Sequence, residues 1–321
     1  MQRCLITGCG GFIGSHLAER LLAEGWSVYG TARRQRRNLE HLRDRLDVRE
    51  CDILDSAHLE ALVAEARPDV VFHLAAQSSV PASWRQPELT FRVNVFGTLY
   101  LLEALRRAAP GATTVAVTSS AIYGLTHDHE LPIKEGKEPR PSSPYGVSKT
   151  AADMLARLYG QAYGLQVVRA RPFFVTGPRK LGDVCADFCC GVAEIEIGQR
   201  QSLDVGNLEA VRDFVDVRDA VEALRLLAGK GQPGEAYNIC SGTGTRVSDL
   251  LSMVIDAARA PIPIHRDPQR HRALDDPITV GDRSRLSALG WAPRLPIEQT
   301  VADTLEFWRR QALTAVAGGV L

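Results

Sequence analysis

The chain has 321 residues, 45% of them hydrophobic, and carries 38 Lys and Arg residues against 38 Asp and Glu residues. This length and composition can bury one large core and a smaller lobe. A formal net charge of zero gives no sign of binding to nucleic acid or to a membrane surface. Because no apolar run reaches the length of a membrane span and the N-terminus lacks a signal-peptide layout, we expect a cytoplasmic protein.

The N-terminal residues predict a strand, a glycine-rich turn and a helix in direct succession. Residues 3–7 (RCLIT) predict the strand and residues 12–23 the amphipathic helix. Glycines between them would let the backbone point N–H groups and the positive helix end at a pyrophosphate. The spacing is G-x-x-G-x-x-G, not G-x-G-x-x-G, so a glycine turn without ligand is the alternative. Its place right after the first strand favours a dinucleotide, with predicted contacts at Gly8, Gly11, Phe12, Ile13 and Gly14.

The second predicted strand, residues 26–32, ends in Arg33 and Arg34. An NAD site normally has a carboxylate there for the adenosine ribose, whereas arginine favours a 2′-phosphate. No Asp or Glu lies between Val28 and Arg37. The sequence therefore predicts NADP(H), with NAD(H) and a merely solvated basic loop as alternatives. A third strand over 48–52 would bring Asp52 to the adenine, with Ile53 beside it.

Strands and helices then alternate up to about residue 171. The pattern predicts a helix at 56–66, a strand at 69–74, a helix at 87–109, a strand at 113–118, a helix at 142–163 and a strand at 166–171. Repeated βα units imply an α/β, Rossmann-type doubly wound parallel sheet. We therefore expect a dinucleotide domain at 1–171, with a returning segment near 205–240, and a smaller mixed substrate lobe at 172–321.

Tyr145 stands four residues before Lys149 and so shares a helical face with it. The unperturbed pKa of a phenol is about 10, and a neighbouring ammonium favours the phenolate, so the tyrosine can exchange a proton with a substrate oxygen. Ser119 follows a predicted central strand, where its hydroxyl can reach a substrate carbonyl. Tyr145 and Lys149 could instead be a solvated helix face, and Ser119 or Ser120 a helix cap or turn residue.

The seven cysteines are scattered, and we expect them to be reduced and mostly buried. Cys185, Cys189 and Cys190 cluster, but no second Cys or His pair at zinc spacing accompanies them. No metal site is expected.

Several motifs resemble the extended short-chain dehydrogenase/reductase family. They are TGCGGFIG, HLAA (73–76), NVFGT (94–98), SPYGVSK and GDRSRLSALGW (281–291). The resemblance implies further cofactor contacts at Leu74, Ala75 and Ala76 and a nucleotide-sugar lobe. Residues 205–219 look like enzymes that act on GDP-mannose derivatives, namely GDP-mannose 4,6-dehydratases and, more closely, GDP-4-keto-6-deoxy-mannose reductases.

The same resemblance suggests residues that bind the sugar nucleotide. Arg212 and Arg272 would hold the diphosphate, which suits the guanidinium fork, and Asp275 the ribose. The remaining substrate contacts implied are Ser83, Ser120, Arg179 and Asn207.

Two departures from the family pattern bear on the reaction. Dehydratases place an acid two residues after the catalytic Ser or Thr to help expel water, but this chain has Ala121 there. Family members usually hold Asn where this chain has Phe174, which cannot hydrogen-bond a phosphate or sugar hydroxyl.

These features predict NADPH-dependent reduction of the C-4 ketone of a GDP-4-keto-6-deoxy-hexose. Ser119, Tyr145 and Lys149 would be the catalytic residues. A nucleotide-sugar 4-epimerase is the main alternative, a dehydratase is disfavoured, and a redox-sensing dinucleotide scaffold is a third class. By analogy with the family, we expect a homodimer that pairs through helices 87–109 and 142–163.

Overall fold

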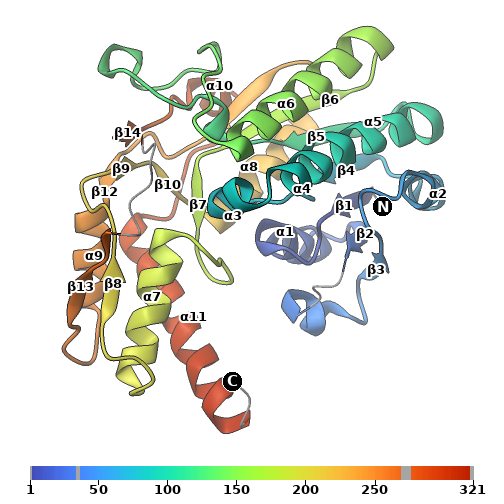
Figure 1. Cartoon of the computed structure of the whole chain (residues 1–321). Coiled ribbons are helices and arrows are strands. Elements are labelled where there is room, and N and C mark those ends of the chain that lie inside the picture. The colour runs from blue at the N-terminus through green and yellow to red at the C-terminus, as the bar shows by residue number, and fades with distance from the viewer. Residues whose placement is uncertain (1, 34–36, 269–275, 319–321) are drawn as a thin grey trace.

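A computed structural model describes residues 2–33, 37–268 and 276–318. Its centre is a parallel sheet of seven strands in the order β3–β2–β1–β4–β5–β6–β11 (Figure 1). The strands are β1 (Arg3–Thr7), β2 (Ser27–Ala32), β3 (Asp47–Glu50), β4 (Val70–His73), β5 (Thr113–Val117), β6 (Val167–Pro172) and β11 (Ala236–Ile239). This topology confirms the predicted Rossmann-type doubly wound fold.

Helices cover both faces of this sheet because its strands are apolar on both sides. Helices α1 (Phe12–Ala23) and α8 (Val217–Lys230) share one buried cluster with Ile6 and Phe72 of the strands. Helices α2 (Ser56–Ala66), α5 (Gly97–Ala108) and α6 (Pro144–Tyr163) share another with Leu5 and Val71. Neighbouring strand residues thus face opposite layers, as the two-residue period of a strand requires.

The C-terminal lobe has its own apolar core. Helices α7 (Val184–Glu196), α9 (Val247–Asp256) and α11 (Ile297–Gly318) enclose it, and the strands β8 (Leu203–Val205) and β13 (Ile264–Arg266) pair in parallel beside them. Between the lobe and the sheet lie the pair β7 (Phe174–Thr176) and β10 (Phe214–Asp216) and the small sheet of β9 (Val211–Arg212), β12 (Thr245–Arg246) and β14 (Ile278–Thr279). A short helix α10 (Ser284–Ala288) contacts β11. Although α8 and β11 lie beyond residue 171 in the chain, they belong to the large sheet and its cover.

The long helix predicted over 87–109 is interrupted. After the short helix α3 (Val80–Arg85), the chain forms α4 (Pro87–Phe91), a π-helical turn at Arg92–Phe96, and α5. The turn contains the buried Asn94, whose amide bonds to the backbone of Gln77 in both directions, at 2.8 and 3.0 Å. A wider turn aims this side chain inward, as π-bulges at functional sites often do.

The third strand also ends earlier than predicted, at Glu50, and Asp52 lies in the loop beyond it. There its carboxylate accepts a hydrogen bond from the backbone N–H of Leu54 at 3.0 Å. Across the described ranges, no helix combines the length and the apolar character that crossing a bilayer requires.

Candidate active site

The glycine-rich turn forms a tight backbone cradle at the start of α1. Gly8 has φ +71°, and a Cβ built on it would lie 2.8 Å from the backbone of Ala75. A Cβ on Gly14 would lie 2.4 Å from the carbonyl oxygen of Gly8, so neither glycine can carry a side chain. No side chain caps the helix at Gly11. The N–H groups of the first turn therefore point at a place suited to a phosphate.

The residues that follow β2, β3 and β4 lie at the same carboxyl edge of the parallel sheet as this cradle. Arg33 follows the last residue of β2 and is exposed, while Arg34 lies outside the described residues. Ile53 is buried and Asp52 half-buried in the loop after β3. Leu74, Ala75 and Ala76 continue from β4, and Ala75 is the residue that approaches Gly8.

The loop after β4 is held in place by two buried polar side chains, His73 and Asn94. Neither was identified as a site residue from the sequence. His73 at the end of β4 bonds to Thr7 Oγ1 at 2.8 Å and to Thr98 Oγ1 at 2.9 Å. Burial, with help from the charge of Lys149, lowers the pKa of His73 to about 3, so the imidazole is neutral. Asn94 also donates to Ser148 Oγ at 2.9 Å. Their positions in HLAA and NVFGT were visible in the sequence, but the π-helical turn that directs Asn94 inward was not.

Ser119, Tyr145 and Lys149 come together at the carboxyl end of β5. Ser119 follows this strand and forms a hydrogen bond with Tyr145. Lys149, one helical turn beyond Tyr145 on α6, donates to the backbone carbonyl of Val117 at 3.0 Å. Ser143 caps α6 by accepting from the N–H of Gly146 at 3.1 Å, which sets where the helix begins and therefore where Tyr145 points.

Burial controls the protonation of this set. It raises the pKa of Tyr145, against the smaller lowering by Ser119, so the phenol is protonated at neutral pH. This direction is opposite to the expected shift toward the phenolate, because burial is the largest influence on the pKa of Tyr145 in the cofactor-free protein. Burial also lowers the pKa of Lys149 to about 8, against the raising effect of Asp153.

Asp153 lies one turn below Lys149 and is held by two arginines. Arg169 donates to it at 2.6 Å, Arg171 at 2.7 and 3.0 Å, and Thr118 at 3.1 Å. Burial would raise the pKa of this carboxyl, but the hydrogen bonds and charges of Arg171 and Arg169 outweigh it and lower the pKa. Asp153 is thus an ionised support for the site and offers no proton.

The predicted substrate residues do not gather in one place. Ser120 is buried next to Ser119, whereas the hydroxyl of the fully buried Ser83 donates to the carbonyl of Val80 on its own helix, at 2.7 Å. Asn207 accepts from the N–H of Glu209 at 3.0 Å. Arg179 binds α1 instead, through Ser15 and Glu19. Arg272 and Asp275 lie outside the described residues.

Arg212 of β9 and Phe174 of β7 lie together between the C-terminal lobe and the large sheet. The guanidinium of Arg212 is buried and lies 5.3 Å from the centre of the Phe174 ring. Phe174 in turn packs against Phe214 at 6.1 Å between ring centres. An aromatic face therefore occupies the position where the family pattern has an amide.

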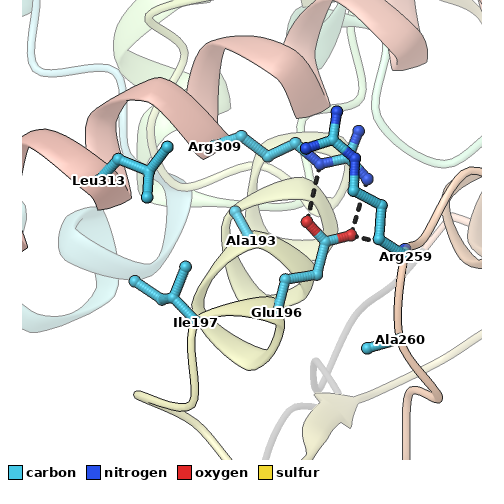
Figure 2. A pocket seen from close by; sticks show the side chains of 7 residues that line it. All are labelled: Ala193, Glu196, Ile197, Arg259, Ala260, Arg309 and Leu313. Carbon is cyan, nitrogen blue, oxygen red and sulfur yellow. Dashed lines mark hydrogen bonds and ion pairs between the residues drawn. The ribbon is translucent and has the colours of Figure 1, made fainter.

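Two pockets lie away from the catalytic set. One, of about 170 Å³, is formed by α7, α11 and the segment after α9, and its lining side chains surround Glu196 (Figure 2). Glu196 pairs with Arg309 at 2.7 Å and accepts a hydrogen bond from the backbone N–H of Arg259 at 2.8 Å. The other, of about 460 Å³, lies between α1, α8 and residues 294–295. Neither pocket is lined by Ser119, Tyr145 or Lys149. In the first pocket, Glu196 and Arg309 already neutralise each other's charge.

A doubly wound parallel sheet, a glycine cradle at its first helix and a Ser–Tyr–Lys set at β5 and α6 define an NAD(P)-dependent enzyme of the extended short-chain dehydrogenase/reductase type. More narrowly, the model of the GDP-mannose 4,6-dehydratase family matches residues 5–304, and the chain belongs to this family.

Relatives within this group differ in the reaction they catalyse. GDP-6-deoxy-D-mannose reductase of Pseudomonas aeruginosa is 34% identical, over 96% of this chain and 97% of its own. UDP-glucose 4-epimerase of Mycolicibacterium smegmatis is also 34% identical, over 97% of this chain and 100% of its own. The structure of RMD from Pseudomonas aeruginosa complexed with NADPH has a TM-score of 0.85 at 32% identity, covering 97% of this chain and 100% of that one. The fold and family are therefore shared by reductases and epimerases.

Proposed function

We propose that the protein reduces the C-4 ketone of a GDP-4-keto-6-deoxy-hexose with NADPH and yields a GDP-6-deoxyhexose of the GDP-rhamnose type. NADPH supplies the hydride. Tyr145 then donates its proton to the carbonyl oxygen, Ser119 orients that oxygen, and Lys149 stabilises the phenolate left on Tyr145.

The observation that carries this proposal is the geometry of the Ser119–Tyr145–Lys149 set, in which Ser119 and Tyr145 are hydrogen-bonded and Lys149 lies one helical turn beyond Tyr145 at the carboxyl end of β5. A ketone reduction needs an acid next to the hydride acceptor, and a phenol with an ordinary pKa of about 10 is protonated at neutral pH. As hydride arrives and charge develops on the substrate oxygen, the ammonium of Lys149 makes loss of that proton easier.

The surroundings of Ser119 argue against a dehydratase. Elimination of water needs a proton donor for the leaving hydroxyl, and the residue two positions after Ser119 is Ala121. Asp153, the acid below Lys149, is ionised and paired with Arg169 and Arg171. Ketone reduction requires no such donor.

The proposed coenzyme rests on the glycine cradle and on Arg33. Gly8, Gly11 and Gly14 fit a pyrophosphate, and Arg33 at the end of β2 suits a 2′-phosphate, with NAD(H) as the alternative. The NADPH complex of the related RMD structure supports the same choice. Arg212 and Asn207 are proposed to contact the nucleotide sugar, together with Ser120.

The direct test is turnover. Purified protein with GDP-4-keto-6-deoxy-mannose should consume NADPH one-for-one with the ketone, and product analysis should show a GDP-6-deoxyhexose. Absence of NADPH consumption with this ketone, by protein shown to bind NADPH, would exclude the reductase.

A 4-epimerase is the second candidate, favoured by the 34% identity to UDP-glucose 4-epimerase. It would use the same three residues to oxidise and re-reduce one sugar on a retained coenzyme. Conversion of a nucleotide sugar to its C-4 epimer without added coenzyme would establish it.

The proposal extends to a homodimer in the cytoplasm. Exposed apolar side chains follow one face of α6, and the π-helical turn adds another from the neighbouring helix: Val147, Met154, Leu158 and Phe96 are 41%, 57%, 54% and 47% exposed. Such a stripe is typical of a buried interface between helices. Reducing conditions in the cytoplasm would keep the seven thiols free.

A further inference from the structure

The turn that carries Ser119 is held by a buried tyrosine outside the catalytic set. Ser119 begins a short 3-10 turn, and its hydroxyl oxygen accepts a hydrogen bond from the N–H of Ala121 at 3.1 Å. Tyr123 ends this turn and is fully buried. The hydroxyl of Tyr123 donates to Asn238 Oδ1 on β11 at 2.6 Å and accepts from Arg171 on β6 at 3.1 Å. Two strands of the large sheet therefore fix the end of the turn that Ser119 begins.

The amide of Asn238 continues this connection away from Tyr123. Its Nδ2 donates to the backbone carbonyls of Ile133 at 2.9 Å and Asp282 at 3.3 Å. Because both of these groups can only accept, Nδ2 must face them, and Oδ1 is left for the Tyr123 hydroxyl. Asn238 is fully buried, so this orientation is fixed by protein groups on both sides of the amide.

The residues around Asp282 also contact the strand that carries Arg212. Gly281, which precedes Asp282, donates its N–H to the carboxylate of Asp213 at 3.1 Å. Asp213 is fully buried and directly follows Arg212. A buried series of hydrogen bonds thus connects the neighbour of Arg212, which is proposed to bind the nucleotide sugar, to the turn of Ser119, which is proposed to orient its carbonyl.

We infer that Tyr123 is a positioning residue, which through Asn238 holds the Ser119 hydroxyl where it meets the substrate carbonyl. The same connection keeps Ser119 in register with Arg212 at the other end of the substrate. The inference rests on the proposed function, since it uses the role of Ser119 in orienting the C-4 oxygen. Tyr123 is too deeply buried to touch a substrate, and burial raises the pKa of its phenol to about 12, so the hydroxyl keeps the proton that it donates to Asn238.

Steady-state kinetics of Tyr123→Phe, which loses only the hydroxyl, test this inference. We expect kcat on the GDP-keto sugar to fall about tenfold, because a small displacement of an orienting group is costly, while KM and the dissociation constant of NADPH stay within about twofold. In a Ser119→Ala background the same substitution should change kcat by less than about twofold, because the group that it positions is already absent. Asn238→Ser removes the same bond from the other partner, should have the same effect, and carries the test if Tyr123→Phe does not fold.

Tyr237→Phe is the matched control. Tyr237 is a buried tyrosine of the same strand, and its hydroxyl accepts from the backbone N–H of Gln232 at 3.0 Å, outside the connection to Ser119. Its kcat should equal that of the wild type. An unchanged kcat in Tyr123→Phe would overturn the inference. A tenfold loss that persists in the Ser119→Ala background would also overturn it, because Tyr123 would then act on something other than Ser119.

Hydrogen exchange separates this inference from the proposed function, because it needs no turnover. The amides of residues 119–123 should exchange about tenfold faster in Tyr123→Phe and in Asn238→Ser than in the wild type, and at the wild-type rate in Tyr237→Phe. If the wild type does not reduce the ketone and these amides still loosen in both variants, only the proposed function is lost. If they do not loosen, or if exchange rises equally along the whole chain, the positioning role is lost whatever the wild type catalyses.

Discussion

The guanidinium carbon of Arg212 stands 5.3 Å above the centre of the Phe174 ring, and both residues belong to the short strands that join the lobe to the sheet. The Phe174 ring also packs edge-on against Phe214, with 6.1 Å between the ring centres. Phe174 therefore makes up in part for the amide it replaces, because it restricts the orientation of an arginine proposed to bind the diphosphate.

Replacing Phe174 with Leu should weaken binding of the nucleotide sugar. Loss of a cation–π contact costs about 1 kcal/mol, so KM should rise about fivefold while kcat stays within about twofold. Phe174→Tyr keeps the aromatic face and should behave like the wild type. Steady-state kinetics on the GDP-keto sugar measure both constants; equal KM values for the Leu and Tyr variants would contradict the stacking role.

Tyr145→Phe should remove turnover and leave coenzyme binding intact. The variant lacks only the hydroxyl that donates the proton, so kcat should fall by about 10²-fold or more. A parallel NADPH titration shows whether the coenzyme still binds. Turnover near the wild-type rate would exclude Tyr145 as the acid.

The pH profile should reflect Lys149. Its pKa is lowered to about 8, so above that pH the ammonium loses its proton and no longer stabilises the Tyr145 phenolate that forms during reduction. We expect kcat/KM to fall as pH rises through about 8 and, in Lys149→Arg, the falling limb to move to higher pH because an arginine stays charged. A wild-type profile that is level up to pH 10 would contradict this assignment.

The stability of the cofactor-free protein should also depend on the titration of Lys149, but it should rise with pH where kcat/KM falls. A lysine with a lowered pKa binds its proton more weakly in the folded than in the unfolded chain. The free energy of unfolding should therefore gain a favourable contribution as pH rises from about 8 to about 10.5, the ordinary lysine value. Urea unfolding of the wild type and Lys149→Met at pH 7 and 9.5 isolates this contribution, which should be absent from the variant.

Asp153→Asn should destabilise the fold severely. It leaves Arg169 and Arg171 buried without a counter-charge, at a cost of about 3–5 kcal/mol. Asp44→Asn is the control, because Asp44 is 90% exposed in a loose pair with Arg43 and should change stability by less than about 0.5 kcal/mol. Chemical unfolding measures both; similar values for the two variants would contradict the supporting role of Asp153.

Most of the sheet could be predicted from the sequence. Strands such as Arg3–Thr7 and helices such as Phe12–Ala23 follow from local apolar period and glycine placement, and the structure has the same bounds. The interruption at Asn94 could not be predicted, because the contact of Asn94 with Gln77 that accompanies it is a tertiary one. Nor could the place of Arg179, since its position on α1 depends on a loop conformation that sequence patterns do not encode.

Within the candidate site, local spacing placed Tyr145 and Lys149 on one turn, but the direction of their pKa shifts depends on burial. The sequence indicated a charge beside a phenol, whereas both pKa values are shifted mainly by burial, which only the packed structure shows. Asp153 was not identified from the sequence, because its arginine partners lie on β6, which only the fold brings next to α6.

Helix α6 presents Tyr145 and Lys149 to the sheet and Val147, Met154 and Leu158 to the outside. The same helix thus carries the proposed catalytic residues on one face and an exposed apolar face on the other. If two copies pair through this apolar face, α6 of each subunit would separate its catalytic residues from the interface by about one helix diameter. A tilt of α6 in one subunit would then displace α6, and with it Tyr145, in the other subunit.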